Sequence, residues 1–554
     1  MPHSIVRRTS ARLVILMSLV YAGLLAPCAA YVVGMAAAPA ARTLCSIAPE
    51  WCGDAWPARA ARAVRHFASA VHYVDLSFPA LVVALVLSVL GFGAVYVVVG
   101  ASRSAFAVRG LAGIDLLKRD LLPRGTTPAV VPESLGLPCA ALYLLVLAVF
   151  VPFRYFGPSA YGPLSADRLL HEGLHQDLAS FLSAILSMYS GAFLGFVDDV
   201  LDIRWRYKLP IPLLSSIPML VVYMASGGHT SVVVPGWPPF LRSFLGCTSL
   251  DLGIFYYVYM MLLATFCTNC INILAGINGV EIGQALVIAT SVCINDLLYL
   301  DIPGVVRAAV DNPHRPPDVA DYLRGYYGSS DLVLRHLFSL HLLLPFIGTS
   351  LGLLAWNRFP ARVFVGDTYC YFAGMVLVSA GVLGHYSKTL LLFFLPQIFN
   401  FVLSCPQLFG LVPCPRHRVP FVDASSGKLY PSSVRLSHLP APLRRVRNTA
   451  LAILERLALV VRLYDEHGAI VGVTNLTLLN ALLVARGSRV QPVSSAQLAT
   501  CYAQADPALR TTPVPGTLKV SEHALWYHIM AVQVLGSVVA FSIRYWLASV
   551  VFPQ

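Results

Sequence analysis

The sequence predicts an all-α polytopic membrane protein: a ten-helix transmembrane bundle with a small cytosolic α/β insertion and an extra N-terminal apolar segment. Three observations predict this class. Hydrophobic residues make up 57% of the 554-residue chain and charged residues only 12%, whereas soluble domains are about 45–50% apolar and about 25% charged. Mean hydropathy is +0.70. The apolar residues also fall into runs of about 20, the length that crosses a bilayer as a helix.

The N-terminal apolar segment, residues 1–36, begins with three arginines and continues as one long apolar run. Small residues late in the run are typical of a signal peptide, but the run is also long enough for a retained signal anchor. Either way, we expect residues 37–76 to be a lumenal segment. There Cys45 and Cys52 could form a disulfide, because an oxidising compartment permits one.

Ten further apolar runs predict the spans of the bundle. They cover residues 78–100, 137–153, 176–196, 209–226, 252–271, 282–300, 334–356, 369–386, 389–412 and 526–548. We group the first nine as a transmembrane catalytic bundle at 77–412 and take 526–554 as the last span. The predicted architecture is therefore a single membrane bundle that most of the chain helps to build.

The loops between the spans predict an orientation. The loop 101–136 is rich in Arg and Lys, and basic loops stay in the cytosol. Alternation then places 197–208, 272–281, 357–367 and 413–525 on the same side. The net charge of +12 therefore predicts a basic cytosolic face rather than nucleic-acid binding.

Residues 413–525 are the extramembrane stretch long enough for a cytosolic loop and a small α/β subdomain. Within it, residues 457–487 predict a strand, a turn, a second strand and a short helix. Asn475 begins an N-glycosylation sequon, which stays unmodified if this loop is cytosolic. Residues 301–333 are interpreted as an insertion without catalytic content.

Twelve cysteines are scattered through the chain, many of them inside apolar runs. This distribution is typical of packing rather than of a disulfide framework. Cys267 and Cys270 form a lone C-x-x-C with no second pair and no neighbouring His, so we do not expect a metal or redox site there.

The densest charge in the chain lies at Gly195–Lys208, at the inner end of a predicted span. The stretch carries Asp198, Asp199, Asp202, Arg204, Arg206 and Lys208. In a helix the three carboxylates would fall within about 100° of arc. Their repulsion would favour Mg²⁺ or a cationic side chain between them. A solvated charge cluster beside the membrane is the alternative interpretation.

The stretch 268–283 places Asn269, Asn272, Asn278 and Glu281 at the inner end of another span. Amides and carboxylates in or beside hydrocarbon are costly and usually serve a ligand or an ion. The alternative is hydrogen bonding between helices of the bundle.

Asp367 follows Gly366 at the start of a later span. Alone it could be a helix N-cap. Together with Asn278 it offers two oxygen ligands to a hard cation, and Mg²⁺ typically takes one or two carboxylates plus phosphate oxygens and waters.

Basic residues follow the ninth span in PCPRHRVP, residues 413–420, where Arg416, His417 and Arg418 stand between two prolines. Guanidinium groups suit phosphate and sugar hydroxyls, although a basic membrane anchor is the alternative. Asp115, Lys118 and Glu133 in the first cytosolic loop are weak signals by themselves. Taken together, the acids, amides and cations at one membrane face predict phosphoryl transfer.

Six strings resemble the eukaryotic members of the polyprenyl-phosphate hexose-1-phosphate transferase superfamily. They are GFVDDVLDIRWRYK, TNCINILAGINGVEIG, RVFVGDTYCYFAGM, LPQIFNFVLSCPQLF, PCPRHRVP and the closing SIRYWL. The resemblance runs from about Phe78 to the C-terminus. The N-terminal run and residues 301–333 lie outside it.

The resemblance implies ten spans, a homodimer in the endoplasmic reticulum membrane and an active site that faces the cytosol. It implies transfer of GlcNAc-1-phosphate from UDP-GlcNAc to dolichyl phosphate with Mg²⁺, giving GlcNAc-diphosphodolichol and UMP. This is the first step in making the lipid-linked oligosaccharide for protein N-glycosylation, and the step that tunicamycin inhibits. No nucleic acid is implied as a partner.

The resemblance also implies roles for individual residues. Asp367 and Asn278 match the metal ligands, and Lys208 and Arg416 match the clamp on the pyrophosphate. Asp198 and Asp199 match the acidic pair, either of which could contact the lipid phosphate or act as a base. Further matches are His417, Arg418 and Trp205 for the sugar, Phe364 for the uracil, Asn272 for the substrate, and Lys118 and Glu133 for the first cytosolic loop.

Two positions depart from the pattern that the resemblance predicts. Asp202 stands where we expect Asn, and Phe421 stands where we expect Arg. Both changes concern sugar recognition. Two other functions stay open: a bacterial-type enzyme that uses undecaprenyl phosphate and another UDP-sugar, and a secondary transporter. Transporters place their sites near the midplane on broken helices, whereas the charges here gather at one face.

Overall fold

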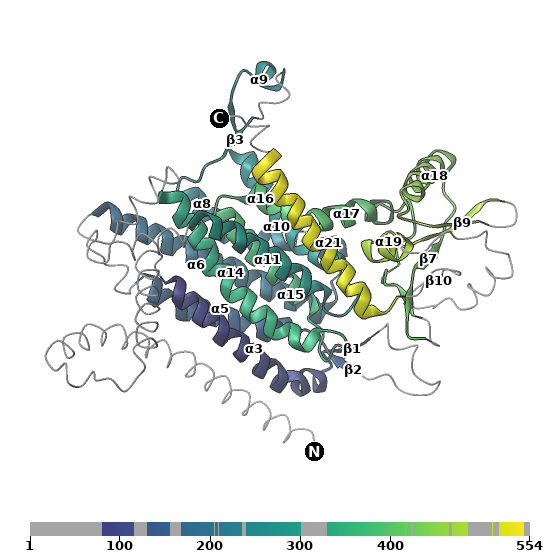
Figure 1. The fold of residues 1–554 in the computed structure, drawn as a ribbon, viewed down its shortest axis with the longest axis horizontal. Coiled ribbons are helices and arrows are strands. Elements are labelled where there is room, and N and C mark those ends of the chain that lie inside the picture. The colour runs from purple at the N-terminus through teal and green to yellow at the C-terminus, as the bar shows by residue number, and fades with distance from the viewer. Residues whose placement is uncertain are drawn as a thin grey trace, which may run out of the picture.

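The computed structural model describes residues 80–115, 130–155, 168–203, 205–208, 210–234, 240–300, 330–415, 417–422, 426–464, 468–485, 512–513 and 520–547. These residues form a bundle of long helices with a small α/β unit at one flank (Figure 1). The expected N-terminal segment, the Cys45–Cys52 pair and the insertion at 301–333 lie outside the described residues.

Among the described residues, eight helices are long and apolar enough to cross a membrane, judged by length and composition. They are α3 (Leu81–Val108), α5 (Gly136–Tyr155), α6 (Arg168–Leu201), α10 (Ile254–Ile273), α11 (Val280–Leu300), α14 (Ser330–Asn357), α15 (Gly366–Leu383) and α21 (Glu522–Ser542), which continues as a π-helical turn Ile543–Leu547. A mostly helical, polytopic membrane protein is therefore confirmed.

Two of the predicted spans have a different form from the others. Helix α8 (Ile211–Ala225) is apolar but only 15 residues long. The run predicted at 389–412 is a pair of helices, α16 (Ser387–Phe393) and α17 (Leu395–Leu408), bent by 69°. Pro396 stands in the first turn of α17. Proline lacks the N–H that a continuous helix would need there, which accounts for the break.

Helix α15 is the centre of the bundle. It packs most closely against α6 and α10 and also contacts α5 and α14. Of the 18 residues of α15, 89% are buried inside the protein. Helix α15 is therefore surrounded by other helices rather than by lipid. Cys267, Cys270 and Cys370 are buried in the surrounding core, as expected for cysteines that pack.

Short hairpins join some of the helices. Strands β1 (Ala112–Ile114) and β2 (Val130–Pro132) pair antiparallel at one end of the bundle. Strands β3 (Ser231–Val233) and β4 (Ser249–Asp251) form a second hairpin, beside the short helix α9 (Phe240–Leu245). Figure 1 shows the two hairpins at opposite ends of the bundle.

The small α/β unit lies between α17 and α21 in the chain. A four-stranded sheet has the order β10-β7-β9-β8, formed by Thr512–Pro513, Ser432–Arg435, Ile470–Thr474 and Arg462–Tyr464. The unit also contains a two-stranded ladder of β5 (Phe421–Val422) and β6 (Leu429–Tyr430), and the helices α18 (Ala441–Arg456) and α19 (Leu478–Ala485). The order β8, β9, α19 is the one predicted for residues 457–487.

Side chains of α17 connect the α/β unit to the bundle. Ser404 Oγ donates to the Leu476 carbonyl at 2.8 Å, and Gln407 Nε2 donates to Asn475 Oδ1 at 2.9 Å. The Leu478 N–H donates to Asn400 Oδ1 at 2.8 Å. Asn475 is fully buried by these contacts, so in this fold its sequon is not accessible to a glycosyltransferase.

A buried polar cluster joins α11, α14 and the turn after α15. Asp296 Oδ1 lies 2.7 Å from His336 Nδ1, and Asp296 Oδ2 accepts from Ser339 Oγ at 2.5 Å. Tyr386 OH lies 2.5 Å from the same Ser339 oxygen. We call Asp296, His336, Ser339 and Tyr386 the far cluster, because it lies beyond the end of α15 opposite Asp367.

Candidate active site

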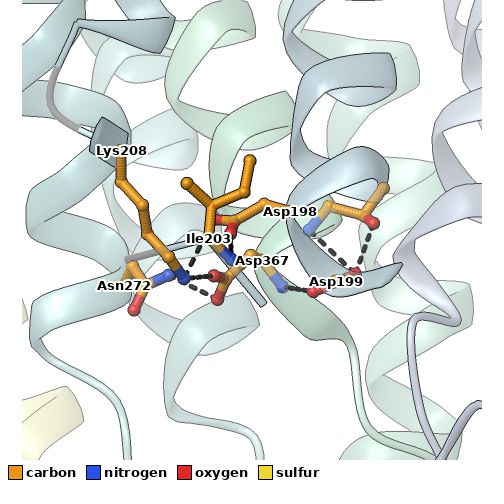
Figure 2. Close-up of polar contacts among 7 residues, drawn as sticks. Asp198, Asp199, Ile203, Lys208, Asn272 and Asp367 are labelled. Atoms are coloured by element: carbon orange, nitrogen blue, oxygen red, sulfur yellow. Dashed lines mark hydrogen bonds and ion pairs between the residues drawn. The ribbon is translucent and has the colours of Figure 1, made fainter. Parts of the chain in front are cut away.

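Charged and amide side chains from α6, α7 (Trp205–Lys208), α10 and α15 converge at one end of the bundle (Figure 2). Asp198 and Asp199 lie in the last turn of α6, and Asn272 lies in the last turn of α10. Asp367 is the second residue of α15, and Lys208 ends the single turn of α7. We call Asp198, Asp199, Lys208, Asn272 and Asp367 the near cluster.

Lys208 bridges two of the carboxylates. Its Nζ lies 2.7 Å from Asp367 Oδ2 and 2.9 Å from Asp198 Oδ2, and Figure 2 shows the side chain directed between the two acids. The Asp198 side chain is completely buried, whereas Asp367 and Lys208 keep 25% and 21% exposure. A cation thus separates Asp198 from Asp367, rather than the three acids of the 195–208 stretch for which the sequence predicted one, and Asp367 remains accessible.

Burial and neighbouring charges act in opposite directions on Lys208. Desolvation by burial lowers the pKa of its ammonium, but Asp367 and Asp198 favour the charged form, and the net effect raises the pKa above its ordinary value. Lys208 therefore stays protonated. A fixed positive charge here can balance the negative charge of a phosphate that approaches the site.

Asp199 has a different task, since its carboxylate caps the N-terminus of α15. Oδ1 accepts from the Asp367 N–H at 2.6 Å, and Oδ2 accepts from the Thr368 N–H at 3.2 Å and from Thr368 Oγ1 at 2.5 Å. The first N–H groups of a helix lack partners inside the helix and attract negative charge. Asp199 thereby fixes the position of Asp367 relative to α6.

This cap depends on the glycine at 366. Its φ is +72°, and a Cβ built there would lie 2.2 Å from Asp199 Oδ2. A side chain would therefore be strained and would also displace the carboxylate. The alternative in which Asp367 itself is the N-cap is wrong, because Val365 occupies that position and the Asp367 side chain faces Lys208 and Asn272.

The three acids of the 195–208 stretch do not share one helix face. Helix α6 ends at Leu201, and Asp202 has a left-handed backbone with φ +47° and an exposed side chain. Asp198 Oδ1 accepts from the Ile203 N–H at 3.2 Å, which holds the chain where it leaves the helix. The predicted arc of about 100° is therefore wrong for Asp202. Apart from glycine, Asn and Asp are among the residues that best tolerate this left-handed conformation.

The three amides of the 268–283 stretch lie in three different environments. Asn272 Nδ2 donates to Asp367 Oδ1 at 2.5 Å, so Asn272 belongs to the near cluster. Asn278 lies in the break between α10 and α11. Its side-chain Nδ2 lies 3.3 Å from Asp115 Oδ2, and its N–H donates to Glu522 Oε1 at 2.8 Å. Asn269 donates to the Thr265 carbonyl of its own helix.

The oxygen donors of the near cluster suit a hard cation. Among the described residues, no group of three or more His, Cys, Asp and Glu side chains is arranged to hold a metal ion. Asp367 offers a part-exposed carboxylate, whose oxygens accept from Lys208 and Asn272. Asn278 lies outside the near cluster, where its Nδ2 binds Asp115. A carboxylate and an amide are ligand types that Mg²⁺ accepts together with water and phosphate oxygens, so the chemistry of these two residues fits the predicted ion.

The described part of the segment between α3 and α5 lies beside the near cluster. The Phe364 N–H donates to the Pro132 carbonyl at 2.7 Å, and the Leu135 N–H donates to the Phe364 carbonyl at 3.1 Å. Burial raises the pKa of Glu133 above its ordinary value, and the nearby charges of Asp199 and Asp367 raise it further. Glu133 thus lies within electrostatic range of the near cluster, and the backbone of Phe364 is held beside the same loop.

The predicted sugar-binding segment lies beside the α/β unit. Asn480 Nδ2 donates to the Arg418 carbonyl at 3.0 Å and fixes that part of the segment. Arg418 Nη1 is buried and has no hydrogen-bond partner among the described residues, and burial lowers the pKa of the group. His417 is exposed. Arg416, Lys118 and the side chain of Trp205 lie outside the described residues.

Some residues of the site were not predicted from the sequence. Thr368 binds Asp199, and Glu522 binds the Asn278 backbone. Glu522 stands in the first turn of an apolar span and is 5% exposed. The position of Glu522 in the sequence could have identified it as a site residue, because burying a carboxylate at the edge of a membrane is costly. Thr368 carries no comparable signal.

The sequence of this chain is similar to those of known proteins. The model of glycosyl transferase family 4 matches residues 181–385. A Saccharomyces cerevisiae protein named UDP-N-acetylglucosamine–dolichyl-phosphate N-acetylglucosaminephosphotransferase is 41% identical over 416 residues, 73% of this chain and 85% of the yeast protein. Proteins of the same name are 37% identical in Schizosaccharomyces pombe, over 84% of this chain and 92% of theirs, and 45% identical in Dictyostelium discoideum, over 58% and 71%.

Proposed function

The chain belongs to the family of UDP-N-acetylglucosamine–dolichyl-phosphate N-acetylglucosaminephosphotransferases, and on this premise we propose that it transfers GlcNAc-1-phosphate from UDP-GlcNAc to dolichyl phosphate. One observation supports the proposed location of the active site: the ammonium of Lys208 lies between the carboxylates of Asp198 and Asp367 at one end of the membrane bundle. The relatives do not favour a bacterial-type sugar-1-phosphate transferase, and the one-sided charges argue against a transporter.

The reaction joins two phosphates. An oxygen of dolichyl phosphate attacks the phosphorus that carries the sugar, a new P–O bond forms, and the bond from that phosphorus to the oxygen of the uridine phosphate breaks. The products are GlcNAc-diphosphodolichol and UMP. A phosphate monoester has a second pKa near 6, so the nucleophile is largely dianionic at neutral pH. The main task of the site is therefore to bring two anions together rather than to remove a proton.

We propose a separate role in this reaction for each of the main residues of the near cluster. Lys208 supplies positive charge where the pyrophosphate would lie, and it needs no reorganisation because two acids already hold it. Asp198 orients Lys208 and closes the end of α6. Asp199 positions Asp367 through the cap on α15, which favours a positioning role for Asp199 over a role as base.

Mg²⁺ is the cofactor that we propose for this site, with Asp367 and Asn278 as its protein ligands. When bound, it would neutralise charge on the pyrophosphate oxygens. Arg416, His417 and Arg418, with Trp205, are proposed to bind the sugar phosphate. The buried and unpartnered Nη1 of Arg418 supports anion binding beside the α/β unit. Phe364 and Glu133 are proposed to contact the nucleotide, and Lys118 to act beside them.

The wider organisation is proposed on the same premise. We propose ten crossings, in which α8 and the bent α16–α17 pair each count as one, and a homodimer in the endoplasmic reticulum membrane. The near cluster would face the cytosol, and tunicamycin would inhibit the enzyme. The domain limits stay as predicted, at 1–36, 37–76, 77–412, 413–525 and 526–554.

A transfer assay tests the proposal. Purified protein in lipid is given UDP-GlcNAc labelled in the sugar, dolichyl phosphate and Mg²⁺. Label should move into the organic-soluble fraction with an equal amount of UMP, and chelation of Mg²⁺ or addition of tunicamycin should stop it. Transfer only to undecaprenyl phosphate, or only from another UDP-sugar, would favour the bacterial-type alternative. Transport of UDP-GlcNAc without UMP release would favour the transporter.

A further inference from the structure

Helix α18 of the α/β unit carries an apolar stripe that the protein leaves uncovered. Leu443, Val446 and Ile453 on the helix, and Leu457 just after it, are between 45% and 62% exposed. At about 100° per residue, these four positions lie within about 80° of arc. The protein itself is packed against a different face, through Leu451 and Arg447. The stripe is therefore an unpartnered surface and not part of the core.

Exposed arginines accompany the stripe. Arg444, Arg445 and Arg456 are exposed and have no ion-pair partner among the described residues. The single acid of the helix, Glu455, is already bound by the N–H and the guanidinium of Arg462. Arg447 is buried and donates to the Ser437 carbonyl. The exposed surface of α18 is thus apolar along one line and positively charged around it.

The position of α18 connects this surface with the membrane. Leu451 of α18 and Leu403 of α17 belong to one buried hydrophobic cluster, and Figure 1 shows α18 beyond the end of α17 on one flank of the bundle. Helix α17 is the second half of a bent candidate span. Its own side chains Val402 and, just past its end, Phe409 are 61% and 74% exposed, as expected for residues that face lipid. Helix α18 therefore packs beside a candidate span, and both helices carry exposed apolar side chains.

We propose that α18 lies on the membrane surface at the active-site end of the bundle, with the stripe in the lipid and the arginines among anionic lipid phosphates. An amphipathic helix with a basic polar face binds a bilayer in this way, and its apolar side enters the headgroup boundary by about 5–10 Å. The positive charge of the exposed arginines complements the negative charge of anionic lipid headgroups, which favours lipid over a second protein as the partner of this surface. This inference does not depend on the proposed reaction.

Contact between α18 and the bilayer would fix the distance of the proposed sugar-binding segment from the membrane surface. The cluster that holds Leu451 also contains Leu476 and Ala481, and the neighbouring Asn480 binds the Arg418 carbonyl. A chain of packed side chains thus runs from α18 to Arg418. Docking of α18 would set the distance between that segment and the bilayer, where a lipid substrate presents its phosphate.

Photocrosslinking tests the proposal on the full-length protein. A photoreactive amino acid is placed at Ile453 or, on the opposite side of the helix about 140° away, at Asn448. The protein is reconstituted in nanodiscs that contain one anionic phospholipid and one zwitterionic phospholipid, irradiated, and analysed by mass spectrometry. Phospholipid adducts should form at 453 and be at least about tenfold less abundant at 448. Val446 provides a second position on the stripe if the protein labelled at 453 does not elute as a single species.

Substitution of the exposed arginines provides a second arm of the crosslinking experiment. With Arg445→Gln and Arg456→Gln, adduct yield at 453 should fall by about fivefold for each arginine in anionic nanodiscs and change little in zwitterionic ones. Adducts that join two copies of the chain through 453 would overturn the proposal, because the stripe would then be a dimer interface. Equal lipid labelling at 453 and 448, or none at either 453 or 446 in well-folded protein, would also overturn it.

Discussion

The near and far clusters are two buried carboxylate sites in one bundle, and they are compensated differently. Helix α15 separates them by about 27 Å, since it has 18 residues with a rise of about 1.5 Å each. In the far cluster a single carboxylate, Asp296, lies between one imidazole, of His336, and one hydroxyl, of Ser339. In the near cluster three carboxylates lie around one described cation, Lys208, which contacts Asp198 and Asp367, while Asp199 caps α15.

This difference separates a structural site from a site built for a ligand. The far cluster is complete as it stands, and Tyr299 also stacks on His336 with ring centroids 3.9 Å apart. The near cluster holds an excess of negative charge at a membrane boundary, which is costly unless a ligand uses it. Its Asp367 is part-exposed, whereas the far cluster is closed to solvent. Incomplete compensation, rather than burial of charge, marks the functional end.

The largest effect is expected for Asp367→Asn. The substitution keeps the shape of the side chain but removes the carboxylate proposed to hold Mg²⁺. Transfer activity should fall by about 10³-fold or more, about 4 kcal/mol of transition-state stabilisation. The melting temperature in detergent should not fall, because less like charge would remain at the near cluster. Near wild-type activity would make the near cluster structural, like the far one.

A slightly smaller loss is expected for Lys208→Gln. The change leaves Asp198 and Asp367 without the ammonium between them and removes charge that would meet the pyrophosphate. The transfer rate should drop by about 10²–10³-fold. Lys208→Arg serves as the matched control, and it should recover part of the rate because it restores the charge with a different shape. Equal rates for the Gln and Arg variants would show that the charge is not what matters.

Asp199→Asn tests the positioning role of the acidic pair. Asparagine keeps one acceptor for the α15 N-terminus but loses the charge that favours the cap. A cap of this kind contributes about 0.5–2 kcal/mol, so activity should fall by about tenfold, well short of the effect at Asp367. Steady-state measurement of both variants under the same conditions decides this. A loss as large as that of Asp367→Asn would point to direct participation of Asp199 in the reaction.

Asp296→Asn should reverse the pattern. It removes a charged acceptor from His336 and Ser339, which contributes about 1–3 kcal/mol to stability. The melting temperature should therefore decrease, while activity per folded molecule stays within about twofold of wild type, because the near cluster lies about 27 Å away. Size-exclusion profiles after heating report the first quantity and the transfer assay the second. A large loss of activity at unchanged stability would mean that the two clusters are coupled.

The smallest effect is expected for Asp202→Asn. Both residues tolerate the left-handed backbone at this position, and the side chain is exposed. Activity and melting temperature should each stay close to wild type, with any change in rate below about threefold. A fall in the KM for UDP-GlcNAc with unchanged kcat would indicate that the extra charge of Asp202 opposes nucleotide-sugar binding.

The sequence predicted which residues would meet better than it predicted what they would do. Asp198, Lys208 and Asp367 could be placed together because each stands at the end of an apolar run on the same face. Helix length and the cost of charge in lipid carry that inference. The cap that Asp199 places on α15 could not be inferred, because it joins residues 168 positions apart through tertiary packing alone.

Two further details were beyond the reach of periodicity. The helical arc predicted for Asp202 was wrong, since nothing in the apolar pattern marks the residue at which α6 stops. The bend between α16 and α17 follows from Pro396, which could be identified in the sequence, but a proline alone does not determine the angle of 69°. The bundle could thus be predicted from composition and run length, whereas the functional detail depends on where helices end.

The hydrogen bonds from α17 to the α/β unit have a consequence for biosynthesis. Ser404 precedes its partner Leu476 by 72 positions. At a synthesis rate of roughly 5–20 residues per second, Ser404 is added to the chain some 4–14 s before Leu476. During this interval the polar side chains of α17 have no completed binding surface. A segment translated after α17 is therefore needed to complete the packing of this candidate span.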